Sequence, residues 1–230
     1  MTEAEQPVVV EVTVAAPIER VWASLRDPDL IRLWHGWHYD ELAQEIDVIF
    51  VKDAEADEAG HTLQLSDGDR FELVATAGGT MVRVVRAPYV PGTEWSEYYH
   101  EITEGWRSFL QQLRFMQDVH PGEQRRTIFL SGSGAAGTLD DLVTSVPSAV
   151  SETPYFVGDH QRGLLLPALG PGLLILASKP VAGDDRGRGL LDAMAIVTMY
   201  GLTEDDFAKE VERWSVWWRS GYPEAAPAQV

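Results

Sequence analysis

The residues that could do chemistry gather in one short segment near the N-terminus. The run LWHGWHYDE, residues 33–41, holds two tryptophans, two histidines and two acids. Imidazole and carboxylate groups bind zinc or iron, so His35, His38 and Asp40 are conceivable metal ligands. A metal site needs three or four convergent ligands, and a spacing of three residues across Gly36 does not direct both imidazoles to one point. We therefore expect no metal in this segment.

The same segment is better interpreted as a loop at the mouth of a ligand cavity. Aromatic rings offer large apolar faces to a small molecule. On this interpretation Trp34 and Trp37 act as lids, and His38 lines the entrance beside them. The alternative is a plain surface loop that binds nothing.

Two arginines lie in a later segment that is typical of a strand. Side chains alternate between the two faces of a strand, so Arg83 and Arg86 lie on opposite faces and one of them can point inward. An inward arginine can hold a ligand carboxylate or phenolate through charge-assisted hydrogen bonds, and Arg83 is taken here as the binding candidate. The alternative is an outward arginine paired with Glu72 on the neighbouring strand.

His61 is a further candidate, because it belongs to a predicted strand and can lie on the inward face. A lone histidine is more often part of the hydrogen-bonded structure than a general base, and no acid–base partner for it is visible in the sequence. We therefore place His61 among the ligand-binding residues and expect no catalytic residue.

The strongest feature of the sequence is an aromatic stripe on a predicted helix. Apolar residues between Trp95 and Leu113 recur at steps of three and four, which indicates one wide apolar helix face. Such aromatic side chains either line a pocket or pack on a sheet, and we expect at least two of them to face a cavity. With two phenylalanines from predicted strands, the pocket-lining set is Phe50, Phe71, Tyr98, Tyr99, Trp106 and Phe109.

The first half of the chain predicts a scaffold for these candidates. Alternating valines predict an opening strand, and Pro17 favours the start of a helix directly after it. Asp67-Gly68 is a strong hairpin signal. The expected order is strand 8–14, helices from 17 and over 29–34, strands 46–50, 61–65, 71–75 and 81–87, and a long helix that ends at 120–122.

The second half repeats this plan in shorter form. We expect strand 126–131, helix 140–146, strands 155–157, 164–167, 173–177 and 190–200, and a last helix from Thr203. The Gly/Ser-rich segment 131–137 is interpreted as a flexible turn. The sequence thus predicts two modules, residues 1–122 and 123–230. Non-alternating leucine runs predict strands covered on both faces, so we expect the second module to pack on the first.

Composition excludes several classes of function. The 230 residues carry a formal net charge of −18, which repels nucleic acid and anionic membrane surfaces. Cysteine is absent, so disulfides and thiolate sites are excluded. The start of the chain lacks a signal-peptide pattern, and the longest apolar segment is interrupted by prolines and glycines. We therefore expect a cytoplasmic protein.

Two segments resemble a known family. VEVTVAAPIERVWASLRDPDLIRLW, residues 10–34, is similar to the opening of START-like proteins of the SRPBCC superfamily, in the branch of the activator of the heat-shock-protein-90 ATPase. EGWRSFLQQL, residues 104–113, resembles the closing helix of that branch. The resemblance covers roughly residues 8–118. It implies a helix-grip fold, in which a curved antiparallel sheet wraps around a long helix and encloses a cavity.

The resemblance also implies a function. Members of the superfamily bind lipids, polyketides or hormones, some cyclise polyketides, and one group protects enediyne producers through its own cleavage. We therefore predict an α+β helix-grip protein without a cofactor that binds a small apolar molecule, for self-resistance or sequestration. A polyketide cyclase-type enzyme and a co-chaperone-like module with a protein partner are the alternatives.

Overall fold

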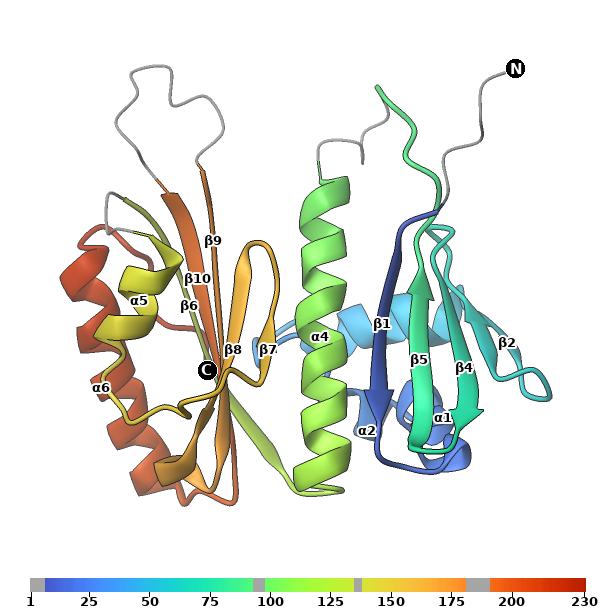
Figure 1. Ribbon diagram of the computed structural model, residues 1–230, viewed down its shortest axis with the longest axis horizontal. Helices are drawn as coiled ribbons and strands as arrows, with labels where there is room; N and C mark the ends of the chain where they lie inside the picture. The colour runs from blue at the N-terminus through green and yellow to red at the C-terminus, as the bar shows by residue number, and fades with distance from the viewer. Residues whose placement is uncertain (1–6, 93–97, 135–137, 181–190) are drawn as a thin grey trace. The chain divides into compact units, whose positions relative to one another are not determined.

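The computed structural model describes residues 7–92, 98–134, 138–180 and 191–230 (Figure 1). The chain divides into two compact units. Unit 1 comprises residues 1–36 and 40–122, and unit 2 comprises residues 37–39 and 123–230.

Unit 1 contains a five-stranded antiparallel sheet with the strand order β1-β5-β4-β3-β2. In β1 the valines at alternate positions are buried, as expected for a strand with one face toward a core. The elements in chain order are β1 (Val9–Val14), α1 (Ile18–Arg26), α2 (Pro28–Ile31), α3 (Leu42–Ile46), the π-helix η1 (Asp47–Lys52), β2 (Glu55–Asp57), β3 (Thr62–Gln64), β4 (Arg70–Thr76), β5 (Gly79–Val85) and α4 (Tyr99–Val119).

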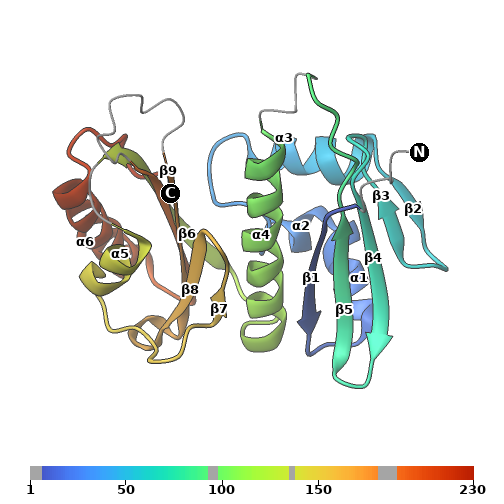
Figure 2. The ribbon, with the colours of Figure 1, turned by 45° about the horizontal axis from the view of Figure 1, so that its top comes forward.

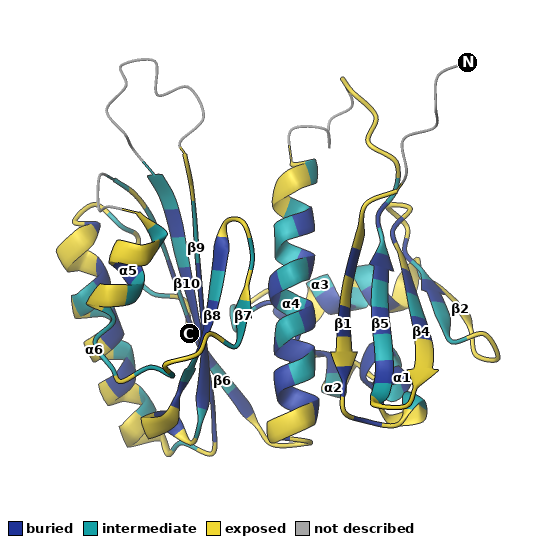
Figure 3. Cartoon of the chain, in the orientation of Figure 1, coloured by how far each residue is buried: buried dark blue, intermediate teal, exposed yellow. Residues whose placement is uncertain are grey.

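The long helix α4 lies against β1, and its buried face carries the later part of the predicted apolar stripe, whose first residue, Trp95, lies outside the described residues (Figure 3). Trp106, Leu110 and Leu113 are buried on this face. The Asp118 carboxylate accepts a hydrogen bond from the Ala15 backbone N–H at 2.8 Å, which ties the helix to the end of β1. A long helix held against an antiparallel sheet is the helix-grip arrangement, and the predicted α+β class is confirmed.

One predicted strand of unit 1 is wrong. Residues 46–50 are helical, in α3 and η1, because Ile46 and Phe50 are buried four residues apart while Val48 between them is 40% exposed. Burial at every fourth residue is a helical period, whereas a strand would bury every second residue. The fifth strand is instead β2, whose residues are all exposed, so no hydrophobic alternation marked it.

Unit 2 repeats the topology of unit 1 with the strand order β6-β10-β9-β8-β7 (Figure 2). In both units the first strand is at an edge, the last strand lies beside it, and the remaining strands follow in reverse order. The elements are β6 (Arg125–Gly134), α5 (Leu139–Ser145), β7 (Phe156–Val157), β8 (Gln161–Leu166), the 3-10 helix η2 (Pro167–Leu169), β9 (Gly172–Pro180), β10 (Leu191–Tyr200) and α6 (Glu204–Gly221). The predicted repeat of strand, helix, strands and helix is confirmed.

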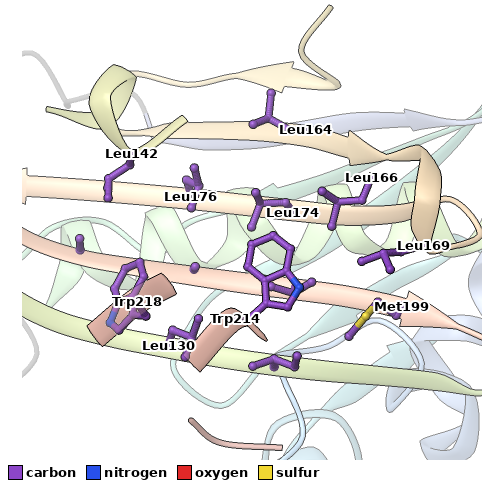
Figure 4. Packing of buried hydrophobic residues seen from close by; sticks show 14 of the residues in the cluster. Leu130, Leu142, Leu164, Leu166, Leu169, Leu174, Leu176, Met199, Trp214 and Trp218 are labelled. Atoms are coloured by element: carbon purple, nitrogen blue, oxygen red, sulfur yellow. The ribbon is translucent and has the colours of Figure 1, made fainter. Parts of the chain in front are cut away.

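The core of unit 2 lies between its sheet and α6 (Figure 4). Leucines of β8 and β9 pack with Trp214 and Trp218 of the helix. Thr203 caps α6, since its side chain accepts a hydrogen bond from the Asp206 N–H. This confirms the predicted helix start.

The Gly/Ser-rich segment is a strand as far as Gly134, and residues 135–137 lie outside the described residues. The expectation of a flexible turn over residues 131–134 is therefore wrong. A Cβ atom on Gly132 would lie 3.0 Å from Cβ of Tyr222, and one on Gly134 would lie 3.3 Å from its ring. The glycines leave room for an aromatic side chain on the sheet.

Residues 37–39 join unit 2 through the edge strand β6. The Trp37 ring stacks on Phe129 with centroids 3.8 Å apart, and its indole N–H donates to the Gln229 side chain at 2.5 Å. Phe129 and Gln229 also exchange two backbone hydrogen bonds, at 2.9 and 3.0 Å. The His38 N–H donates to Thr127 Oγ1 at 2.6 Å. A segment of the first half thus packs on the edge strand of the second sheet.

Candidate functional site

The interior of unit 1 holds a buried ion pair between Asp69 and Arg86. Their side chains are 1% and 4% exposed, and Nη1 of Arg86 lies 2.5 Å from Oδ2 of Asp69. Asp69 follows the Asp67-Gly68 turn before β4, and Arg86 follows β5. The carboxylate also accepts hydrogen bonds from the Ala87 N–H at 2.9 Å and from the Trp106 indole at 2.8 Å.

The environment of Asp69 opposes its negative charge. Burial raises the pKa of Asp69, and the Ala87 N–H, the Arg86 guanidinium and the Trp106 indole offset this only in part. A buried ion pair contributes little to stability, because the cost of removing both charges from water offsets their attraction. Perturbed and buried charges concentrate at functional sites, so this pair is the best candidate for chemistry in unit 1.

An aromatic cluster with rings from α4, β4, η1 and the segment after α2 meets the ion pair at Trp106. Trp106 on α4 contacts Phe71 on β4, with ring centroids 5.1 Å apart, and Phe109 one turn further along α4, at 6.2 Å. Phe50 on η1 lies 6.0 Å from Phe71 and 5.8 Å from Trp34, which follows α2. Five of the predicted ligand-binding residues are therefore brought together in one aromatic cluster.

His35 belongs to this cluster and was not among the predicted binding residues. Its ring lies 4.9 Å from Phe109 and 5.1 Å from Phe50, and its Nε2 is 2.8 Å from Oε1 of Glu45. His35 is 1% exposed. The acid partner ten residues further on was a usable signal, but the predicted strand over 46–50 obscured the helical turn that carries Glu45.

Tyrosines extend the cluster to the surface. The Tyr99 ring lies 4.6 Å from the guanidinium carbon of Arg86, and its hydroxyl donates to the Ala87 carbonyl at 2.9 Å. Tyr89 contacts Tyr99 at 5.4 Å and is 44% exposed. Tyr98, the residue before α4, is 51% exposed. We call Tyr89, Tyr98 and Tyr99 the tyrosine rim.

The proposed lids have other roles in the structure. Trp34 is fully buried, and its indole donates to the Ser24 carbonyl at 2.8 Å, so it is a core residue rather than a lid. Trp37 and His38 belong to unit 2 and contact β6.

Arg83 and His61 lie apart from the cluster. Arg83 is 39% exposed, and its Nε is 3.0 Å from the carboxylate of Glu11 on β1, so the inward arginine is Arg86 rather than Arg83. His61 has a positive φ of 49° before β3, where its Nε2 is 3.1 Å from Glu19 and its ring contacts Trp22.

Within the described ranges, no group of three or more histidines and acids is arranged to hold a metal ion. In the same ranges, no helix has the length and hydrophobicity that crossing a membrane requires.

Comparisons with known proteins give fold-level similarity only. No protein-family model and no curated protein matches the chain. The di-domain ARO/CYC StfQ from the steffimycin biosynthetic pathway is 13% identical with a TM-score of 0.35, over 93% of this chain and 95% of that one.

Two smaller structures match about half of the chain. Protein MLL2253 from Mesorhizobium loti is 21% identical with a TM-score of 0.36, over 50% of this chain and 98% of that one. Protein NE0264 from Nitrosomonas europaea is 17% identical with a TM-score of 0.30, over 49% and 94%.

Proposed function

We propose that unit 1 binds a small apolar molecule at its aromatic cluster, with Arg86 as the polar anchor. The observation that carries this proposal is the Nε atom of Arg86, a buried donor without a hydrogen-bond partner among the described residues. It belongs to a guanidinium that is 4% exposed and lies under the ring of Tyr99. Binding sites for small molecules combine apolar and aromatic walls with a few polar groups that fix orientation.

The charges around the site define the ligand that fits. Asp69 neutralises the guanidinium, and the chain as a whole carries a formal charge of −18, so an anion gains little. A neutral molecule with an oxygen acceptor can take the free Nε donor, while its apolar body lies against the rings. Burial of that body contributes roughly 25 cal/mol per Å².

The test compares ligand binding after substitution of the buried Arg86 and of the exposed Arg83. Native mass spectrometry and thermal shifts with polyketides, enediyne analogues and lipids identify a ligand, because a ligand that binds the folded state must stabilise it. Arg86→Gln then weakens binding about tenfold or more, since it removes a charge-assisted hydrogen bond. Arg83→Gln, on the outer face, is the matched control and leaves binding unchanged.

The double variant Asp69→Asn/Arg86→Gln guards against a folding defect, because it leaves two neutral amides rather than one unpaired charge. Equal ligand affinity in the Arg86→Gln and Arg83→Gln proteins contradicts the proposal. So does the absence of a thermal shift with every compound.

A second candidate, a cyclase-type enzyme, is favoured by the raised pKa of Asp69. A carboxylate with a raised pKa is a stronger base than an exposed one and can accept a proton from a ligand during an intramolecular condensation. Chromatography of a linear polyketone incubated with the protein tests this, and Asp69→Asn abolishes product formation. An unchanged substrate argues against it. Self-sacrifice with an activated enediyne stays a prediction, and peptide fragments after incubation are its readout.

A further inference from the structure

The core of unit 2 contains two polar atoms that its packing does not use. Trp218 and Tyr222 are 2% and 1% exposed, and their rings stack with centroids 4.6 Å apart at 27°. Neither Nε1 of Trp218 nor the hydroxyl of Tyr222 has a hydrogen-bond partner in the described parts of the chain. Both groups are buried donors at the C-terminal end of α6.

Other tryptophans of the same helix do have partners. The Trp214 indole donates to Oε2 of Glu210 at 3.2 Å, and the Trp217 indole donates to Oγ of Ser145 at 3.2 Å. These two indoles therefore have acceptors, one from α6 itself and one from α5, and the stack of Trp218 and Tyr222 is a local exception.

The two donors are unfavourable for stability in this place. A buried donor left without an acceptor loses its hydrogen bonds to water and gains nothing in return. Phenylalanine at position 222 would keep the ring contacts without that cost. Burial raises the pKa of Tyr222, so its phenol stays protonated and remains a donor. Because packing alone does not require these groups, a bound acceptor is the simplest reason for them.

The surroundings of the stack are apolar and have small side chains on the sheet. Gly132 and Gly134 of β6 lie under Tyr222. The hydrophobic cluster around Trp218 includes Leu130, Leu142 and Leu176 (Figure 4). Its small and aliphatic members near this end are Leu130, Leu142, Leu176, Ala193 and Ala195. Such a site favours a neutral ligand, since an ion would lose its hydration without a countercharge.

We propose that unit 2 holds a second binding site, in which Trp218 and Tyr222 donate hydrogen bonds to the oxygen of a neutral apolar molecule. An aromatic ketone has this chemistry, because its ring lies against the stack and its carbonyl oxygen accepts. The site is independent of the one in unit 1 and has different polar groups.

Acetylnaphthalene, an aromatic ketone, is the probe ligand. Ethylnaphthalene has a similar shape but no oxygen acceptor and is the control ligand. Isothermal titration of the full chain measures the affinity and the number of sites. We expect Tyr222→Phe and Trp218→Phe each to weaken ketone binding about three- to tenfold, as expected for one lost hydrogen bond. Trp217→Phe, on the same helix, is the control and leaves the affinity unchanged.

The thermal midpoint of the free Tyr222→Phe protein should not fall, because the substitution removes an unsatisfied donor, so weakened binding cannot be attributed to unfolding. Equal ketone affinity in the wild-type and Tyr222→Phe proteins overturns the proposal, as does equal affinity for the ketone and the hydrocarbon. Sensitivity to Arg86→Gln alone assigns the ketone to unit 1 and also overturns it. If only the unit 1 proposal fails, titration shows one ketone site, and Tyr222→Phe weakens binding at that site while Arg86→Gln does not.

Discussion

The two units share one strand order and differ in what they bury. Unit 1 places the charged side chains of Asp69 and Arg86 between its sheet and α4, with His35 and Gln112 also fully buried. Unit 2 also buries charged side chains, those of Arg125 and Glu210, but its hydrophobic cluster is built from aliphatic residues, tryptophans and a tyrosine. The comparison shows that strand order and a closing helix define the fold, while the interior is free to take on separate functions.

The tryptophans of the closing helices α4 and α6 have different hydrogen-bond partners. The Trp106 indole on α4 donates across the interior to Asp69, which precedes β4. The Trp214 indole on α6 donates to Glu210, one turn earlier on its own helix. In unit 1 the indole therefore links helix and sheet through a buried hydrogen bond, whereas in unit 2 that link is the ion pair between Arg126 of β6 and Glu204 of α6, whose side chains are 29% and 83% exposed.

The largest effect should come from breaking the charge pair of unit 1. Asp69→Leu leaves Arg86 buried without its partner and should destabilise the protein by about 3–5 kcal/mol in urea unfolding. The double variant Asp69→Leu/Arg86→Met should recover most of this loss. If the double variant is as unstable as the single one, the interior of unit 1 depends on packing as unit 2 does.

Close packing in unit 2 should give the next largest effect. Gly132→Ala puts a methyl group 3.0 Å from Cβ of Tyr222 and should destabilise the protein by about 1–3 kcal/mol. Gly78→Ala in the β4–β5 turn of unit 1 meets no atom within 4 Å and serves as the control. Similar melting temperatures for the two variants would show that β6 and Tyr222 are not tightly packed against each other.

Substitutions at the N-terminal ends of α4 and α6 should have smaller effects on stability. Thr203→Ala removes the N-cap hydrogen bond of α6 and should cost about 1 kcal/mol. Tyr98 makes no side-chain cap hydrogen bond for α4, so Tyr98→Ala should cost no capping energy. Urea titrations followed by circular dichroism measure both. A larger loss for Tyr98→Ala would assign the tyrosine rim a role in stability.

The smallest effect should come from the outer face of unit 1. Arg83→Gln removes an exposed pair with Glu11, and such pairs contribute about 0.2–1 kcal/mol. The loss should shrink further in high salt, because exposed charges are screened. A loss comparable to that of Asp69→Leu would contradict the assignment of Arg86 as the inward arginine.

Much of the fold could be predicted because it depends on local periodicity. The alternation in β1, the stripe on α4 and the cap at Thr203 all describe a single element and its buried face. The strand β2 could not be found this way, because its side chains are all exposed. The packing of the second module on the first stays a prediction.

The site was predicted in part for the same reason. Large aromatic residues on a buried face could be predicted from the sequence, and they form the aromatic cluster of unit 1. Arg86 was also readable, since it continues the alternation of the buried Val82 and Val84. The position of Trp37 could not be predicted, because its partner Phe129 lies far along the chain and no local pattern links the two residues.

The contact between Trp37 and Phe129 has a consequence for synthesis on the ribosome. Trp37 is made roughly 90 residues before Phe129, so at about 5–20 residues per second it waits roughly 5–18 s for its partner. Throughout that interval the growing chain lacks the β6 surface on which the indole stacks. A chaperone that recognises exposed aromatic side chains has its opportunity in this interval, and the synthesis of β6 ends it.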